Sequence, residues 1–123
     1  MAAHVIFDDR LKFRGKRDTI RRLNAFAAAG ADVLYAPGLR DLDTIRQVAA
    51  AVPKPLNVVM SAADPNLTAQ QLEAAGVKRI SVGGALSRLG FAAVRDAALA
   101  MRAGSFAWVP DAMPNKDLKA MFR

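Results

Sequence analysis

The sequence RDTIRRLNAFAAAGADVLYAPGLRDL, residues 17–42, decides the fold, because it holds a helix, a tight turn and a strand in succession. Four apolar residues recur at helical spacing: Ile20, Leu23, Phe26 and Ala27. They predict a helix over 18–29 with Asp18 as its N-cap, and Gly30 ends it where a left-handed residue costs least. The apolar run that follows predicts a strand over 32–36, because it is too short for a helix and is typical of a buried parallel strand.

The same pattern recurs 46 residues later. AAGAD followed by VLYAPG, from residue 28, aligns without a gap on AAGVK followed by RISVGG, from residue 74. A third apolar run, LNVVM at 56–60, begins midway between the two strands of this repeat. The spacing predicts one βα unit about every 23 residues, with a last strand over 79–82.

Helices are expected between and after the strands. Their predicted ranges are 41–52, 68–76, 86–102 and 115–122. Asp41 or Asp43 can cap the first of them, and Thr68 with Gln71 forms a capping-box pattern. We divide the chain into a basic leader (1–16), βα units (17–104) and a tail with a short helix (105–123).

Three strands joined by single helices indicate an α/β fold with a parallel sheet. An open Rossmann-like sheet and part of a (β/α)₈ barrel both satisfy this pattern. No strand is followed by G-x-G-x-x-G, and this favours the barrel.

Composition narrows the class of protein. The 123 residues correspond to one domain or part of one. With 53% hydrophobic residues, so short a chain is expected to expose apolar surface that another polypeptide covers. It has no cysteine, no run long enough to span a bilayer and no signal-peptide core, so we expect no disulfide or thiolate chemistry, no membrane, and a cytoplasmic location.

The net charge of +7 is uneven, because residues 1–22 hold seven Lys/Arg against three Asp. A basic arm can bind nucleic acid, but a solvated leader is the commoner meaning of such a run. No aromatic platform or nucleic-acid motif accompanies it. We therefore do not expect nucleic acid as a partner.

Ligand sites in βα folds lie at the carboxyl ends of the strands. Three segments qualify here: residues 37–40, 60–64 and 83–88. The glycines of the last can cradle a phosphate or carboxylate at a helix N-terminus or simply make a tight turn. Asn57, which is polar within an apolar strand, can face a ligand or satisfy a neighbouring group. General acid–base chemistry is poorly supplied, since His4 lies in the leader and Glu73 on an exposed helix face, and no metal-spaced cluster is present.

Taken in order, RRLNAFAAAGADVLYAPGL, KPLNVV and AAGVKRISVGGALSR resemble the C-terminal part of the isocitrate lyase/phosphoenolpyruvate mutase superfamily, closest to its phosphoenolpyruvate phosphomutase type. The resemblance covers about 18–102. It implies a partial (β/α)₈ barrel, with this chain supplying strands six to eight. It also implies that full-length members bind Mg²⁺ and make or break C–C or P–C bonds in α-oxocarboxylate substrates.

The resemblance also implies what this chain lacks. The family's metal-binding aspartates, gating loop and substrate-carboxylate arginine precede the matched region, so catalytic residues here are unknown. Pro37 stands where the lyase branch has a glutamate. The positions that carry over as substrate-binding candidates are Pro37, Gly38, Asn57, Ser61, Ser81, Gly83 and Gly84.

Two functions follow from the resemblance. The first is a truncated family member that is inactive alone. The second is a half-barrel that pairs with itself or with a separately encoded N-terminal half, as family members are oligomers that exchange their last helix.

Overall fold

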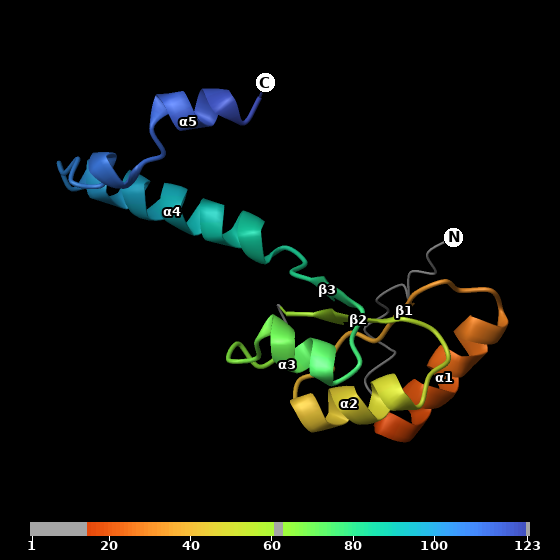
Figure 1. The fold of residues 1–123 in the computed structure, drawn as a ribbon. Coiled ribbons are helices and arrows are strands. Elements are labelled where there is room, and N and C mark those ends of the chain that lie inside the picture. The colour runs from red at the N-terminus through yellow and green to blue at the C-terminus, as the bar shows by residue number, and fades with distance from the viewer. Residues whose placement is uncertain (1–14, 61–62, 123) are drawn as a thin grey trace. The chain divides into compact units, whose positions relative to one another are not determined.

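The chain forms two compact units, Met1–Gly84 and Ala85–Arg123. The computed structural model describes residues 15–60 and 63–122 of them (Figure 1). The predicted leader, with His4, lies almost wholly outside the described residues. The two units are described in turn.

The first unit alternates helices and strands, as the repeat predicts. Its elements are α1 (Lys16–Ala28), β1 (Leu34–Tyr35), α2 (Leu42–Ala50), β2 (Leu56–Val59), α3 (Ala69–Ala74) and β3 (Arg79–Ser81). The strands form one parallel sheet in the order β1-β2-β3. This confirms the α/β class and the three parallel strands, while the assignment to strands six to eight stays a prediction.

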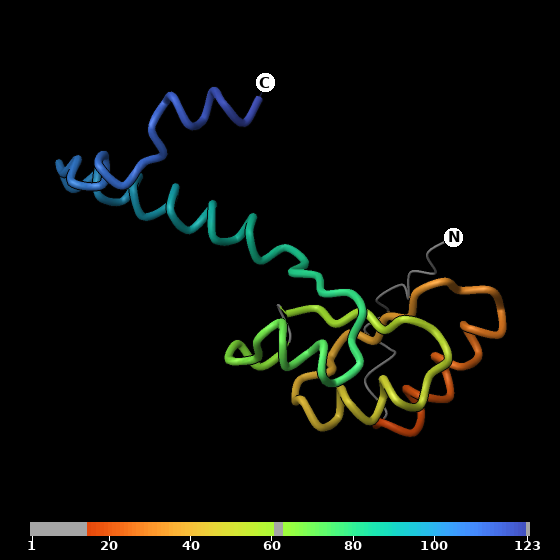
Figure 2. The backbone as a smooth tube through the Cα atoms, viewed as in Figure 1, coloured from red at the N-terminus to blue at the C-terminus, as the bar shows by residue number. Residues whose placement is uncertain are grey.

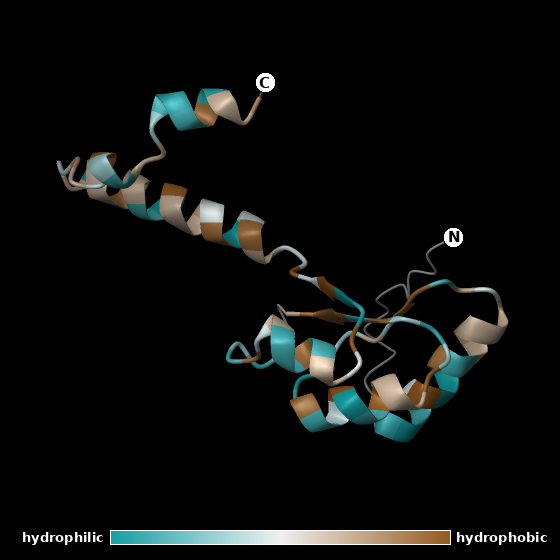
Figure 3. Ribbon diagram, in the orientation of Figure 1, coloured by the Kyte–Doolittle hydropathy of each residue, from teal (hydrophilic) through white to brown (hydrophobic). Residues whose placement is uncertain are grey.

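The core of this unit lies between the sheet and its helices. Helices α1, α2 and α3 lie on the same side of the strands (Figure 1). The largest fully buried side chains come from all three helices and from β1 and β2: Leu23, Leu34, Ile45, Val48, Leu56, Val58 and Leu72. Figure 3 shows hydrophobic segments, in brown, on both the helices and the strands of this unit. Apolar burial of this kind stabilises the fold by about 25 cal/mol per Å².

Helices α1 and α3 end in the same way, which explains the repeated Ala-Ala-Gly. Gly30 and Gly76 adopt φ values of +95° and +91°, the left-handed region that glycine enters at least cost. The bonds that close the two turns are Ala31 N to Phe26 O and Val77 N to Leu72 O, each 3.0 Å. This is the Schellman arrangement, and it turns the chain directly into the next strand.

The start of α1 differs from the sequence prediction. Gly15, not Asp18, is the N-cap, and no side chain caps this helix end. The helix begins at Lys16, so Asp18 lies in its first turn and pairs with arginines one turn on. The other caps are as predicted: Asp41 accepts from Thr44 N at 2.8 Å, and Thr68 with Gln71 forms a capping box.

The second unit is helical. It contains α4 (Ala85–Arg102), the 3₁₀ turn η1 (Val109–Asp111) and α5 (Asn115–Ala120), whose backbone path Figure 2 traces. Helix α4 carries several exposed large apolar side chains: Leu86, Leu89, Phe91, Val94 and Leu99. Among the described helices, none combines the length and apolar character needed to cross a bilayer.

Candidate functional site

The candidate site is built on the sheet face opposite the helices. Side chains alternate along a strand, and Leu56 and Val58 belong to the core under the helices. Asn57 therefore points to the other face. It is only 2% exposed, and within residues 15–60 and 63–122 it is the one buried polar side chain.

The strand register places three polar residues in one row across this face. Tyr35 pairs with Asn57, and Asn57 pairs with Arg79. Asn57 Oδ1 accepts from Arg79 Nη1 at 3.0 Å, and Asn57 Nδ2 donates to Ser81 Oγ at 3.1 Å. Because a guanidinium can only donate, this partner fixes which end of the Asn57 amide is the oxygen.

Ser81 extends the same network. Its hydroxyl lies 3.5 Å from the carbonyl of Val58, to which it donates. The chain of contacts thus runs from Arg79 through Asn57 to Ser81, and it holds β2 and β3 together by side chains in addition to the backbone ladder. Buried polar groups need such partners, and Asn57 has one at each end of its amide.

The network shows that the Asn57 side chain satisfies neighbouring side chains. The other interpretation, that Asn57 faces a ligand, stays a prediction. The structure brings Asn57 and Ser81 together, and both are predicted site residues. Tyr35 and Arg79 were not predicted, although a signal existed. They lie 22 residues before and after Asn57, and this spacing is the register of the sheet.

The loops after β1 and β2 meet at the carboxyl edge of the sheet, as parallel strands require. Asp64 N donates to the carbonyl of Arg40 at 2.9 Å, which ties these two loops together. Pro37 and Gly38 are half-buried at the start of the first loop. Gly38 adopts φ +96°, and Ser61 lies outside the described residues.

Gly83 and Gly84 follow β3 after one intervening residue, Val82, so they belong to the same edge. Gly83 adopts φ +54°, a conformation that favours glycine and turns the chain out of the strand. The first unit ends at Gly84. The anion cradle predicted for these glycines stays a prediction.

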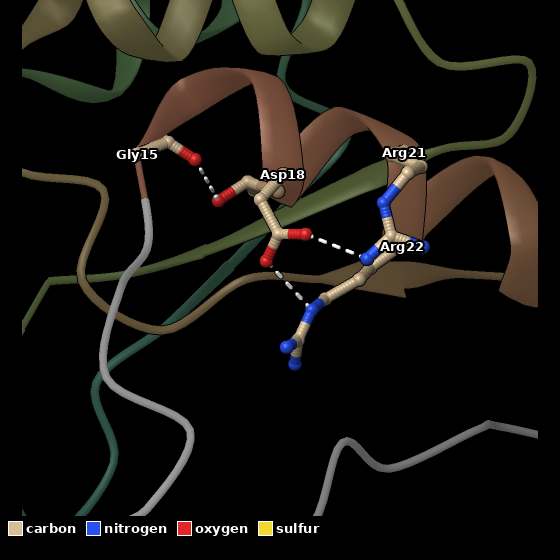
Figure 4. Close-up of polar contacts among 5 residues, drawn as sticks. Gly15, Asp18, Arg21 and Arg22 are labelled. Carbon is tan, nitrogen blue, oxygen red and sulfur yellow. Dashed lines mark hydrogen bonds and ion pairs between the residues drawn. The ribbon is translucent and has the colours of Figure 1, made fainter.

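Charged side chains gather in the first two turns of α1. Asp18 Oδ1 lies 2.6 Å from Arg21 Nη2, and Asp18 Oδ2 lies 2.8 Å from Arg22 Nε (Figure 4). The hydrogen bond from Arg21, helped by the charge of Arg22, holds the pKa of the Asp18 carboxyl below its usual value. A carboxylate at a helix N-terminus also favours the helix dipole, so this cluster stabilises α1.

Within the described part of the chain, no three His, Cys, Asp or Glu side chains come together as a metal site would need. Positive charge and amide or hydroxyl groups dominate the sheet face instead. Such groups can bind and orient a carboxylate or phosphate, and none of them is arranged as a nucleophile with its base.

Comparison with known proteins gives a consistent family. The family model for phosphoenolpyruvate phosphomutase matches residues 8–102. A provisionally assigned lyase/mutase of Burkholderia cenocepacia J2315 has 48% sequence identity and a TM-score of 0.82 over 89% of this chain. No curated protein matches.

Two further solved structures belong to proteins that are named for an enzyme activity. Oxaloacetate acetylhydrolase, in complex with oxalate, is 30% identical over 76% of the chain with a TM-score of 0.65. 2,3-Dimethylmalate lyase, described as a PEP mutase/isocitrate lyase superfamily member, is 30% identical over 80% with a TM-score of 0.63. The matches cover 40%, 34% and 36% of the three relatives, so this chain spans little more than a third of their length.

Proposed function

Since this chain belongs to the phosphoenolpyruvate phosphomutase family of the PEP mutase/isocitrate lyase superfamily, we propose that it supplies three βα units of a (β/α)₈ barrel enzyme. The complete barrel makes or breaks a C–C or P–C bond in an α-oxocarboxylate substrate, with Mg²⁺ as cofactor. The 123-residue chain is inactive alone.

One observation carries this proposal. The chain matches the Burkholderia cenocepacia relative over 89% of its own length but only 40% of the relative's. Among the described residues, the three-stranded parallel sheet has its two edges at β1 and β3, and sheet edges are sites for pairing with further strands. The missing strands of the barrel are the natural partners for these edges.

In the completed barrel, the carboxyl edge of this sheet contributes to substrate binding. We assign that contribution to the backbone of Pro37, Gly38, Gly83 and Gly84, together with the Ser61 loop. Asn57 and Ser81 support this edge through their hydrogen bonds. Pro37 has no ionisable side chain and cannot transfer a proton, so any proton transfer falls to other residues of the barrel.

Magnesium is expected from the family, and it prefers oxygen ligands such as carboxylates. The described residues do not fit such a site, because no three acidic or histidine side chains come together among them. We therefore assign metal binding to the remaining part of the barrel and derive no step through Mg²⁺ from this chain.

The proposal is tested by measuring the activity of the chain alone. The purified chain is incubated with Mg²⁺ and the α-oxo acid oxaloacetate, or with 2,3-dimethylmalate or phosphoenolpyruvate, which the names of the relatives supply. Products are followed by NMR. We expect no turnover by the chain alone. Magnesium-dependent turnover by the pure, monomeric chain would contradict the proposal.

A second candidate is an assembly module that pairs with a second copy of the same chain. The observation in its favour is the apolar surface of α4, where Leu86 and Leu89 are 70% and 69% exposed. Soluble monomers rarely expose large contiguous apolar patches. Light scattering at micromolar concentration distinguishes the candidates: a stable dimer supports self-assembly, and a well-folded monomer contradicts it.

A further inference from the structure

Arg79 is a positive charge on the sheet face that points away from the helix core. It pairs in register with Asn57, and the side chain of Asn57 lies opposite the core residues Leu56 and Val58. Arg79 opens β3, which is an edge strand of the sheet. A charge in this position is unusual, because this face becomes the interior when such strands close into a barrel.

Among the described residues, the partners of Arg79 do not neutralise it. The guanidinium has five N–H donors, and its side-chain hydrogen bond goes to the neutral Oδ1 of Asn57. Other arginines form ion pairs with Asp18, Asp43 and Asp96, and the charge of Lys54 acts on Asp32. No carboxylate of the described part of the chain pairs with Arg79.

Closure of the barrel would bury this charge. An ionised group taken out of water costs several kcal/mol unless it is paired and hydrogen-bonded. Neighbouring strands lie about 4.8 Å apart, so side chains of an added strand, or of strands across the barrel, come within reach of Arg79. A carboxylate is the group that matches the planar fork of a guanidinium best.

We propose that Arg79 is the docking charge of this chain: it pairs with a carboxylate carried, at the level of Tyr35 and Asn57, by the polypeptide that completes the barrel. Asn57 holds the guanidinium in place for this contact. The inference rests on the proposed function, because it needs the remaining strands. It adds the chemical nature of the partner surface, which must be acidic where it meets β3.

The test measures binding between the full 123-residue chain and the complementary part of the Burkholderia cenocepacia relative, produced as a separate polypeptide. The variants are Arg79→Met, which keeps length and removes charge, and Arg79→Lys, which keeps charge and loses the fork. Lys78→Met is the matched control, since Lys78 is the adjacent exposed residue and its loss changes net charge equally. Circular dichroism and thermal unfolding check that each variant keeps its fold.

We expect Arg79→Met to weaken binding by about tenfold or more, because it leaves a buried carboxylate unpaired. Arg79→Lys should fall between it and wild type, and Lys78→Met should stay within about twofold, as expected for a solvated surface charge. Equal binding by wild type and a folded Arg79→Met variant would overturn this inference and leave the proposed function standing. Absence of binding by the wild-type chain would overturn both.

Discussion

At the scale of single residues, the two glycines that end α1 and α3 do the same conformational work in different surroundings. Gly30 and Gly76 have nearly equal φ values, +95° and +91°. A Cβ on Gly30 would meet nothing within 4 Å, whereas a Cβ on Gly76 would lie 3.3 Å from Ala49 Cβ. A side chain at either position would therefore strain the backbone, whereas only a side chain at Gly76 would also crowd a neighbouring residue.

This difference gives a matched pair of variants. Gly30→Ala should lower the free energy of unfolding by about 1–2 kcal/mol through left-handed strain alone. Gly76→Ala should lower it further, because the side chain must also displace Ala49. Urea unfolding of both variants measures the difference, and equal losses would show that α2 yields without cost.

Asp41 gives a pH-dependent contribution. The hydrogen bond from the backbone N–H of Thr44 lowers the pKa of the Asp41 carboxyl. Because the folded-state pKa lies below the unfolded value, near 3.9, this stability is fully present above the unfolded pKa. It is lost as the pH falls through the folded value.

Asp41→Asn separates the charge from the cap, since asparagine is an equally good N-cap. We expect the variant to unfold with a weaker dependence on pH between about 5 and 2 than wild type. Its helix content at neutral pH should be unchanged. Urea unfolding measures the free energy of unfolding of wild type and variant across this pH range. Parallel plots of this free energy against pH would contradict the pH-dependent contribution assigned to Asp41.

Residue-scale contacts were the hardest part to predict. Asn57 stands out in sequence as a polar residue in an apolar strand, but its partners depend on the register of β3 against β2. A shift of one residue would place Arg79 on the opposite face. Sequence periodicity reveals the shared spacing of 22 residues, and only the structure shows that Arg79 and Ser81 both reach the Asn57 amide.

At the scale of elements, sequence patterns located nearly every helix and strand to within about two residues. The helices follow apolar periodicity and cap residues, and the strands follow short apolar runs. β1 is shorter than expected, Leu34–Tyr35 in place of 32–36, because Gly30 and the following turn use the first residues. The predicted start of α1 was wrong because Asp18 lies within the helix, with helical residues on both sides. Its carboxylate forms ion pairs with Arg21 and Arg22 and caps no backbone N–H.

The capping box of α3 is the clearest local stabiliser among these elements. Thr68 Oγ1 accepts from Gln71 N at 3.2 Å, and Gln71 Oε1 accepts from Thr68 N at 2.8 Å. Thr68→Ala should lower the free energy of unfolding by about 1 kcal/mol. Thr68→Ser keeps the hydroxyl and is the control. Denaturant unfolding of the two variants tests this, and equal stability of Ala and Ser would contradict it.

At the scale of the whole molecule, burial differs between the helix-covered core and the edge strand β3. Ile45 of α2 is 0% exposed, whereas Ile80 of β3 is 42% exposed. The same substitution should therefore have unequal effects. Ile45→Ala should cost about 2–5 kcal/mol of unfolding free energy, and Ile80→Ala clearly less.

The comparison also tests completion of the barrel. If further strands and helices cover β3, Ile80→Ala should cost more in the assembled protein than in the isolated chain. Thermal unfolding of the variant, alone and with the complementary part of the relative, measures this. An unchanged cost would mean that the edge at β3 is not covered on assembly.

The register of the sheet has a consequence for how the protein is made. Leu34 pairs with Leu56, and Asn57 pairs with Arg79. Each residue of a strand is therefore followed by its partner in the next strand only 22 residues later in the chain. Ribosomes add roughly 5–20 residues per second, so successive strands emerge roughly one to four seconds apart. Each βα unit can dock on the one before it as synthesis proceeds, and the chain can grow its sheet from β1 towards β3 in the order in which it is translated.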